Sequence, residues 1–200
     1  MAQEMEKQQL RERLDLIESM IAEGRQATGK WGWAFILWGV AYFIAFAWAS
    51  SRWNPQTAWP VTMIAAAVLS GFLGGRRARN RPRTGIGRAI GSIWLTMGTC
   101  LFVLMMSLGL GGRLDNHVSL AIAGAMLAVA NGASSLILKW KMQFACALAW
   151  LAAAEVGCFG SGREGLIAFL AATFFCQIVF GIYAMITESR HGQMQGEVHA

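Results

Sequence analysis

Six stretches of about twenty residues carry almost no charged side chain, and they constrain the fold of this 200-residue chain most. The hydrocarbon core of a bilayer is about 30 Å thick, so a helix of roughly 20 apolar residues crosses it. Backbone groups find no water inside lipid, so such stretches must be helices rather than open strands. We therefore predict six transmembrane helices, at residues 31–51, 55–75, 89–111, 117–138, 142–159 and 165–187.

The overall composition agrees with a membrane protein. Hydrophobic residues make up 56% of the chain and charged residues only 14%, whereas an average soluble domain has about 25% charged residues. This apolar content excludes a disordered chain, and four cysteines are too few for a secreted disulfide scaffold. The expected fold class is an all-α polytopic bundle of residues 31–187, with a cytoplasmic amphipathic helix in residues 1–30 and a cytoplasmic tail at 188–200.

The basic residues lie mostly on one side of the predicted membrane. The N-terminal segment, the loops after the second and fourth spans, and the tail hold 14 of the 17 Lys and Arg residues. The three intervening loops hold only Arg52, Arg113 and Arg163. Lys and Arg stay in the cytoplasm, so both termini are expected there. The charged N-terminal stretch is unlike a cleavable signal peptide, so the first span is the expected insertion signal.

The loop after the second span is rich in arginine and glycine. Anionic lipids of the cytoplasmic leaflet attract such residues, by roughly 1 kcal/mol per basic side chain near the surface. No aromatic residue lies between the arginines, which argues against a nucleic-acid partner. We therefore expect contacts with anionic lipid from Arg76, Arg77, Arg79, Arg81 and Arg83.

The N-terminal segment has the pattern of an amphipathic helix. Leu10, Leu14, Ile17 and Ile21 recur at spacings of four, three and four residues. One interpretation is a helix that lies on the membrane surface or against the cytoplasmic loops. The other is a short coiled coil that joins two copies of the chain or binds a cytoplasmic protein.

Glu155 is the only acidic residue inside a predicted span, in its outer third. An ionisable group within a span is energetically costly and becomes a functional hypothesis by default. In one interpretation Glu155 pairs with Arg163 or Arg113 and holds the outer loops together. In the other it is a protonatable or cation-binding carboxylate at the outer mouth of a pathway, with His117 on the same side of the membrane.

Two amides, Asn131 and Gln177, lie well inside predicted spans. Such side chains commonly form hydrogen bonds between helices, although they could also line the path of a small substrate. Enzyme motifs are missing from the sequence: the four cysteines show no CxxC spacing, the three histidines are scattered, and there is no phosphate-binding loop. We therefore expect no catalytic residues, no metal and no cofactor.

The segment from Leu14 to Ile21, followed by Gly24-Arg25, Trp31-Gly32-Trp33 and Leu37-Trp38-Gly39, resembles the start of small uncharacterised bacterial multi-span membrane proteins. The resemblance covers about the first forty residues and implies a bacterial inner membrane. Two functions remain open. One is a non-enzymatic interaction, sensing or scaffold protein that acts through residues 1–30. The alternative is a small oligomeric transporter or channel with Glu155 near its outer mouth.

Overall fold

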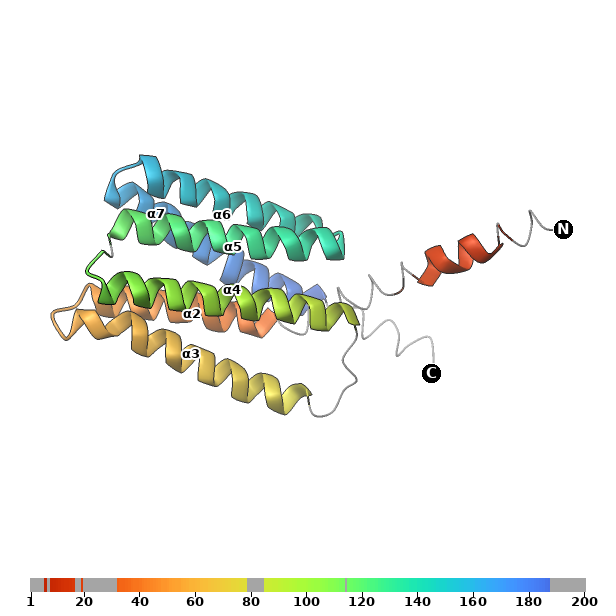
Figure 1. Cartoon of the computed structure of the whole chain (residues 1–200), viewed down its shortest axis with the longest axis horizontal. Coiled ribbons are helices and arrows are strands. Elements are labelled where there is room, and N and C mark those ends of the chain that lie inside the picture. The colour runs from red at the N-terminus through yellow and green to blue at the C-terminus, as the bar shows by residue number, and fades with distance from the viewer. Residues whose placement is uncertain are drawn as a thin grey trace.

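The computed structural model describes residues 6, 8–16, 19, 32–78, 85–113 and 115–187. The regular structure in these ranges is helical throughout, and six of the helices are long and apolar enough to cross a membrane. They run roughly alongside one another as a bundle (Figure 1). The prediction of an all-α membrane protein with six spans is therefore confirmed.

Short connections join the six spanning helices. The last one changes from α-helix to a π-helical segment, η1, and returns to α-helix up to residue 187. The helices are α2 (Gly32–Ala49), α3 (Pro55–Ala78), α4 (Gly85–Leu110), α5 (Asn116–Leu138), α6 (Lys141–Phe159) and α7 (Gly162–Thr173), followed by η1 (Phe174–Val179).

Two helices extend beyond the predicted span boundaries. Those boundaries lie at charged residues, but α3 continues through Arg76 to Ala78, and α4 begins at Gly85, before Arg88. A helix does not end at a charge, because a long basic side chain at the end of a span can reach the interface while its backbone stays helical. Glu155 likewise does not interrupt α6.

Polar caps fix where α5 and α7 begin. The side chain of Asp115 accepts a hydrogen bond from the backbone N–H of His117 at the start of α5. Ser161 and Glu164 form a capping box at the start of α7, in which each side chain accepts from the other residue's backbone N–H. Such caps satisfy N–H groups that have no partner within the helix.

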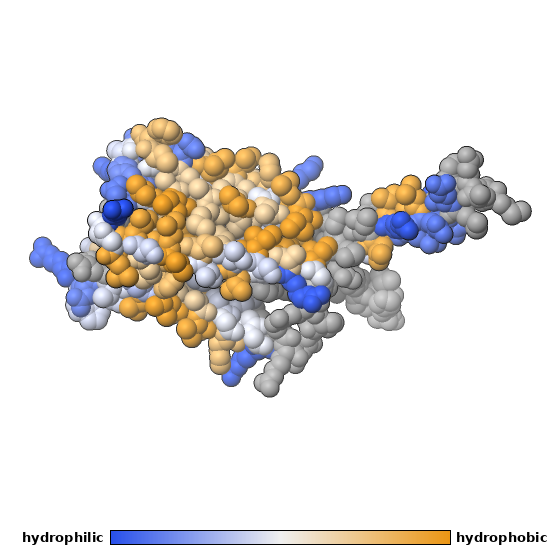
Figure 2. Space-filling model, viewed as in Figure 1, coloured by the Kyte–Doolittle hydropathy of each residue, from blue (hydrophilic) through white to orange (hydrophobic). Residues whose placement is uncertain are grey.

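The core lies among α2, α5, α6 and the last span, whereas α3 and α4 are peripheral. On α6 seven residues are buried, including Trp150, but on α4 only Ile90 is. Figure 2 shows apolar side chains over the middle of the bundle and hydrophilic ones towards its two ends. Lipid tails can cover such a surface, so a helix with one packed face is compatible with a membrane.

The N-terminal helix is described in part. Residues 8–16 are helical, and Leu10, Leu14 and Leu16 on it are exposed. Ile17 and Ile21, which complete the predicted apolar face, lie outside the described residues.

Candidate functional site

Three amide side chains are buried inside the bundle, each on a different helical segment. α5 contributes Asn131, α6 contributes Gln143, and η1 contributes Gln177; each is at most 2% exposed. No charged side chain is among the buried residues that the structure describes. We call Asn131, Gln143, Gln177 and the neighbouring Trp150 the amide cluster.

Contacts between the helices place the four residues in the same part of the bundle, spread over about 10 Å along α6 from Gln143 to Trp150. On α5, a β-carbon placed on Gly132 would lie 3.7 Å from Cβ of Ala147 on α6. On η1, Sγ of Cys176 lies 3.7 Å from the carbonyl oxygen of Cys146 on α6. Asn131 and Gln177 are the immediate chain neighbours of Gly132 and Cys176. Gln143 lies one helical turn before Cys146 and Ala147, a rise of about 5 Å.

Several polar atoms of the cluster have no hydrogen-bond partner among the described residues. They are Oδ1 of Asn131, both Nε2 and Oε1 of Gln143, Nε1 of Trp150, and Oε1 of Gln177. Burying a donor or acceptor without a partner costs about 1–3 kcal/mol. Five such atoms are unusual, because most buried polar side-chain atoms in proteins are paired.

Asn131 forms its hydrogen bond within its own helix. Its Nδ2 donates to the carbonyl oxygen of Leu127, one turn earlier on α5, at 2.9 Å. The expectation that this amide bonds to another helix is therefore wrong for its donor group. The i−4 carbonyl is always within reach of a short polar side chain on a helix, whereas a bond between helices requires the neighbouring side chain to face it.

The π-helical segment η1 carries Gln177 of the amide cluster and its chain neighbour Cys176. A π-helix is rare, and short π segments within α-helices occur frequently at functional sites. η1 packs closely against α2, because a β-carbon placed on Gly39 would lie only 2.9 Å from Cβ of Gln177. The glycine therefore lets α2 approach the backbone of the cluster.

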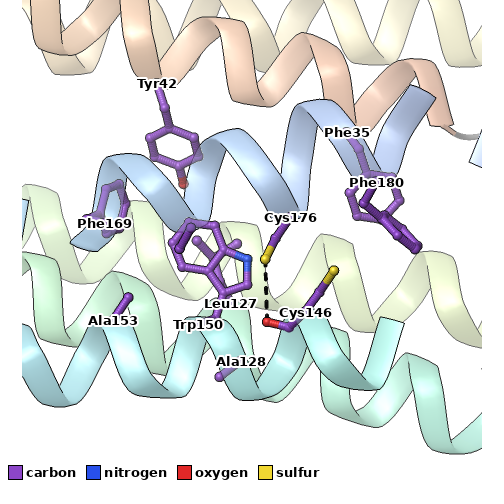
Figure 3. Packing of buried hydrophobic residues seen from close by; sticks show 11 residues of the cluster. Phe35, Tyr42, Leu127, Ala128, Cys146, Trp150, Ala153, Phe169, Cys176 and Phe180 are labelled. Atoms are coloured by element: carbon purple, nitrogen blue, oxygen red, sulfur yellow. Dashed lines mark hydrogen bonds between the residues drawn. The ribbon is translucent and has the colours of Figure 1, made fainter. Parts of the chain in front are cut away.

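Aromatic rings pack beside Trp150 on the side away from the cysteines (Figure 3). The rings of Trp150 and Phe169 have centroids 5.2 Å apart, and Tyr42 lies 5.7 Å from Phe169. In Figure 3 the indole nitrogen of Trp150 lies on the side of its ring that faces Cys176 and Cys146. The unpartnered N–H of Trp150 is thus on the side of the ring nearer the two cysteines.

The structure does not bring the four predicted intramembrane residues, Asn131, Gln177, His117 and Glu155, together at one site. Asn131 and Gln177 lie in the amide cluster. His117 lies at the other end of α5, where its Nδ1 is 3.3 Å from the carbonyl oxygen of Gly157 on α6. Fourteen residues of helix separate His117 from Asn131, a rise of about 21 Å.

Glu155 lies on the exposed surface of α6. Within the described part of the chain it forms no ion pair with Arg113 or Arg163. Glu155 is also twelve residues from Gln143, or about 18 Å along the helix, so it is not part of the amide cluster.

The predicted lipid-binding arginines are described only at the end of α3. The guanidinium carbon of Arg76 lies 4.2 Å from the centroid of the Phe72 ring, a cation–π contact. The side chain of Arg77 and the whole of Arg79, Arg81 and Arg83 lie outside the described residues.

Sequence reasoning missed Gln143 and Trp150. Gln143 is two residues from Lys141, a position typical of an interfacial residue, and tryptophan is common at interfaces. The spacing of Gln143, Ala147 and Trp150, four and then three residues, places them on one face of α6. That periodicity was the signal that could have indicated a buried polar face.

Comparison with known protein families finds no matching family model, and comparisons with curated proteins and with solved structures find no significant similarity. The fold and the amide cluster therefore define a class, an integral membrane protein with six helical spans and a neutral polar interior, without placing the chain in a family.

Proposed function

We propose that this protein is a non-catalytic interaction or sensing protein, in which the six spans anchor an N-terminal helix that binds a cytoplasmic protein. The proposal places the chain in a bacterial inner membrane with both termini in the cytoplasm. It is supported by the one-sided distribution of Lys and Arg and by the N-terminal sequence resemblance described above.

The exposed leucines of the N-terminal helix carry this proposal. Leu10 and Leu14 are four residues apart, so they share one face of the helix, and they are 60% and 54% exposed. Complete burial of a leucine side chain contributes about 1.5–3 kcal/mol. A partner that covers this face would therefore gain a substantial part of its binding energy from two side chains.

Co-purification of the full chain from its own membrane tests the proposal. Replacing both Leu10 and Leu14 by Glu is expected to remove a stoichiometric partner protein. Leu16→Glu is the matched control, because Leu16 is equally exposed but lies on a different face of the helix. A partner that stays bound to the double variant, or the absence of any stoichiometric partner, would contradict the proposal and favour a helix lying on the membrane surface.

A small oligomeric transporter or channel is the second candidate, and the buried amides Asn131 and Gln177 favour it. Because Glu155 is exposed on α6, it could lie at an outer mouth only between copies of the chain. The side of α4 that carries Thr96, Thr99 and Ser107 is also exposed, and these hydroxyls could form hydrogen bonds with another copy.

Flux through reconstituted vesicles tests this second candidate. The wild-type chain is compared with Glu155→Gln for K⁺ movement and with Asn131→Leu for movement of a small neutral solute. The transporter hypothesis expects Glu155→Gln to abolish K⁺ flux while expression is maintained. Unchanged flux in both variants, together with a monomeric mass in detergent, would contradict it.

A further inference from the structure

We propose that two copies of this chain pair in the membrane through one exposed face of α4. We call this face the α4 stripe, and its members are Thr96, Thr99, Cys100, Val103 and Ser107. The inference names the contact that the oligomeric candidate function requires. It concerns assembly alone, so a dimer without flux would leave it intact.

The α4 stripe faces away from the rest of the bundle. Its members recur at spacings of three and four residues, which places them on one side of a helix, and all of them are exposed. Ile90 is the only buried residue of α4, and Trp94 is bonded to Ser134 of α5. At 3.6 residues per turn, Ile90 and Trp94 lie on the side of α4 opposite the stripe. The stripe is therefore free to contact another molecule.

The hydroxyl groups of the stripe have no partner within the described chain. Thr96, Thr99 and Ser107 form no hydrogen bond there, whereas Thr62 and Thr173 in other spans each donate to the carbonyl oxygen four residues earlier. Hydrocarbon offers polar groups nothing to bond to. A molecule that covers the stripe must therefore bring hydrogen-bonding groups of its own, which a lipid acyl chain does not have.

A groove of about 680 Å³ runs beside the stripe, between α4 and α5. One wall includes Thr96 and Cys100 of α4, and the other includes Ala125, Val129 and Ala133 of α5. Small side chains of this kind let helix backbones approach one another closely within a membrane. The groove therefore provides room for apolar side chains of a second molecule next to its hydrogen-bonding groups.

A second copy of this chain fits the stripe because the stripe complements itself. A hydroxyl both donates and accepts hydrogen bonds, so two identical rows of hydroxyls can pair. No charged residue lies between Arg88 and Arg113, so like charges do not oppose the contact. All copies insert with the same orientation, which makes the two α4 helices parallel. In such a two-fold pair each residue meets its own counterpart at the same depth.

Cys100 makes this arrangement directly testable, because it lies in the stripe and is exposed. Membranes that contain the full chain are treated with copper phenanthroline, which takes two electrons from two thiols as they lose their protons and form one disulfide. We expect a covalent dimer that reductant dissolves and that Cys100→Ser abolishes. Cys158→Ser is the matched control and should keep the dimer, because Cys158 is the other exposed cysteine but lies near the end of α6.

The double variant Thr96→Val with Thr99→Val tests whether the hydroxyls hold the pair together. Valine keeps the shape of threonine, so the dissociation constant should rise about tenfold from the lost bonds. Energy transfer between labelled chains in vesicles of decreasing protein content measures it. Ser92→Ala is the control, since Ser92 already donates to Arg88 within its own helix. Ser107→Ala serves if the double variant does not fold, with the same direction of change.

Three results would overturn the proposal. One is a monomeric wild-type chain that gives no covalent dimer at any protein density. Another is a covalent dimer that Cys158→Ser abolishes and Cys100→Ser does not, which would place the contact on α6. The last is unchanged dissociation in the folded threonine and serine variants, which would reduce the Cys100 product to random collisions. K⁺ flux is not measured in any of these experiments, so failure of the transporter hypothesis is distinguishable from failure of the dimer.

Discussion

Trp94 on α4 donates a hydrogen bond from its indole nitrogen to Oγ of Ser134 on α5, over 3.1 Å. The same ring packs edge-on against Phe35 of α2, with centroids 5.1 Å apart. Since Ile90 is the only buried residue of α4, this one tryptophan makes a large share of the specific contacts that attach α4 to the bundle.

Ser134→Ala is therefore expected to weaken the attachment of α4. The change leaves the indole N–H of Trp94 without its acceptor, which we expect to cost about 1–2 kcal/mol of the free energy of unfolding. The measurement is a denaturing-detergent titration followed by circular dichroism. Ser92→Ala is the control, because Ser92 donates only to the Arg88 carbonyl of its own helix. Equal stability of the two variants would show that the bond contributes nothing.

Gly181→Ala is expected to destabilise the contact between the first and last spans. A β-carbon at this position would lie 2.7 Å from the carbonyl oxygen of Gly32 and 2.8 Å from Cγ1 of Ile36. Backbone must then move, at a cost of about 1–3 kcal/mol, as for other overpacked positions. The midpoint of thermal unfolding in detergent measures the effect.

Gly71→Ala is the matched control for the contact of Gly181, because no atom lies within 4 Å of the added carbon. Alanine is the better helix former by up to about 1 kcal/mol, so this variant should be as stable as the wild type or more so. If Gly71→Ala proved the more destabilising of the two, the result would contradict the close approach of α2 and the last span at Gly181.

His117→Ala should loosen the contact between the start of α5 and the end of α6. The substitution removes the contact of Nδ1 with the carbonyl oxygen of Gly157, and we expect a loss of about 0.5–1.5 kcal/mol. Hydrogen exchange of the amides near Gly157 is the measurement, and it should speed up there. Ser119→Ala is the comparison, since Ser119 donates to Asp115 within its own turn. Identical exchange in the two variants would contradict a tie between helices.

The proposed orientation can be tested with single cysteines. Arg113 and Lys141 are both exposed and lie at opposite ends of α5 and its connections. In intact cells a membrane-impermeant maleimide should label Arg113→Cys above the level of the parent chain. Labelling of Lys141→Cys should require permeabilised cells. The reverse pattern would place the termini outside the cytoplasm.

Much of the fold could be predicted because, in a membrane, whether a segment forms a spanning helix depends mainly on the sequence of that segment. The charge pattern predicts a span over residues 142–159 despite Glu155, and α6 is continuous through that residue. Each span is decided by its own length and charge, and its backbone must be helical wherever it meets hydrocarbon. No partner strand or distant contact was needed for these predictions.

Packing between the spans could not be predicted in the same way. Gly71 and Gly75 have the spacing of a helix-packing pair, yet a β-carbon added at either position would have no atom within 4 Å. Gly32 and Gly181 do approach closely, although 149 positions separate them in the chain. Small residues permit a close approach, but the arrangement of all six helices decides where it happens.

The sequence by itself determined the number of spans, their helical form and the one-sided distribution of basic residues, because hydrophobic length and charge act on each segment alone. Only the tertiary structure decided that Gln143 and Trp150 join Asn131 and Gln177 in the interior, while Glu155 lies on the surface. Lipid and protein interior are similarly apolar, so a span rich in apolar residues does not indicate which face is buried. That choice depends on how the neighbouring helices pack.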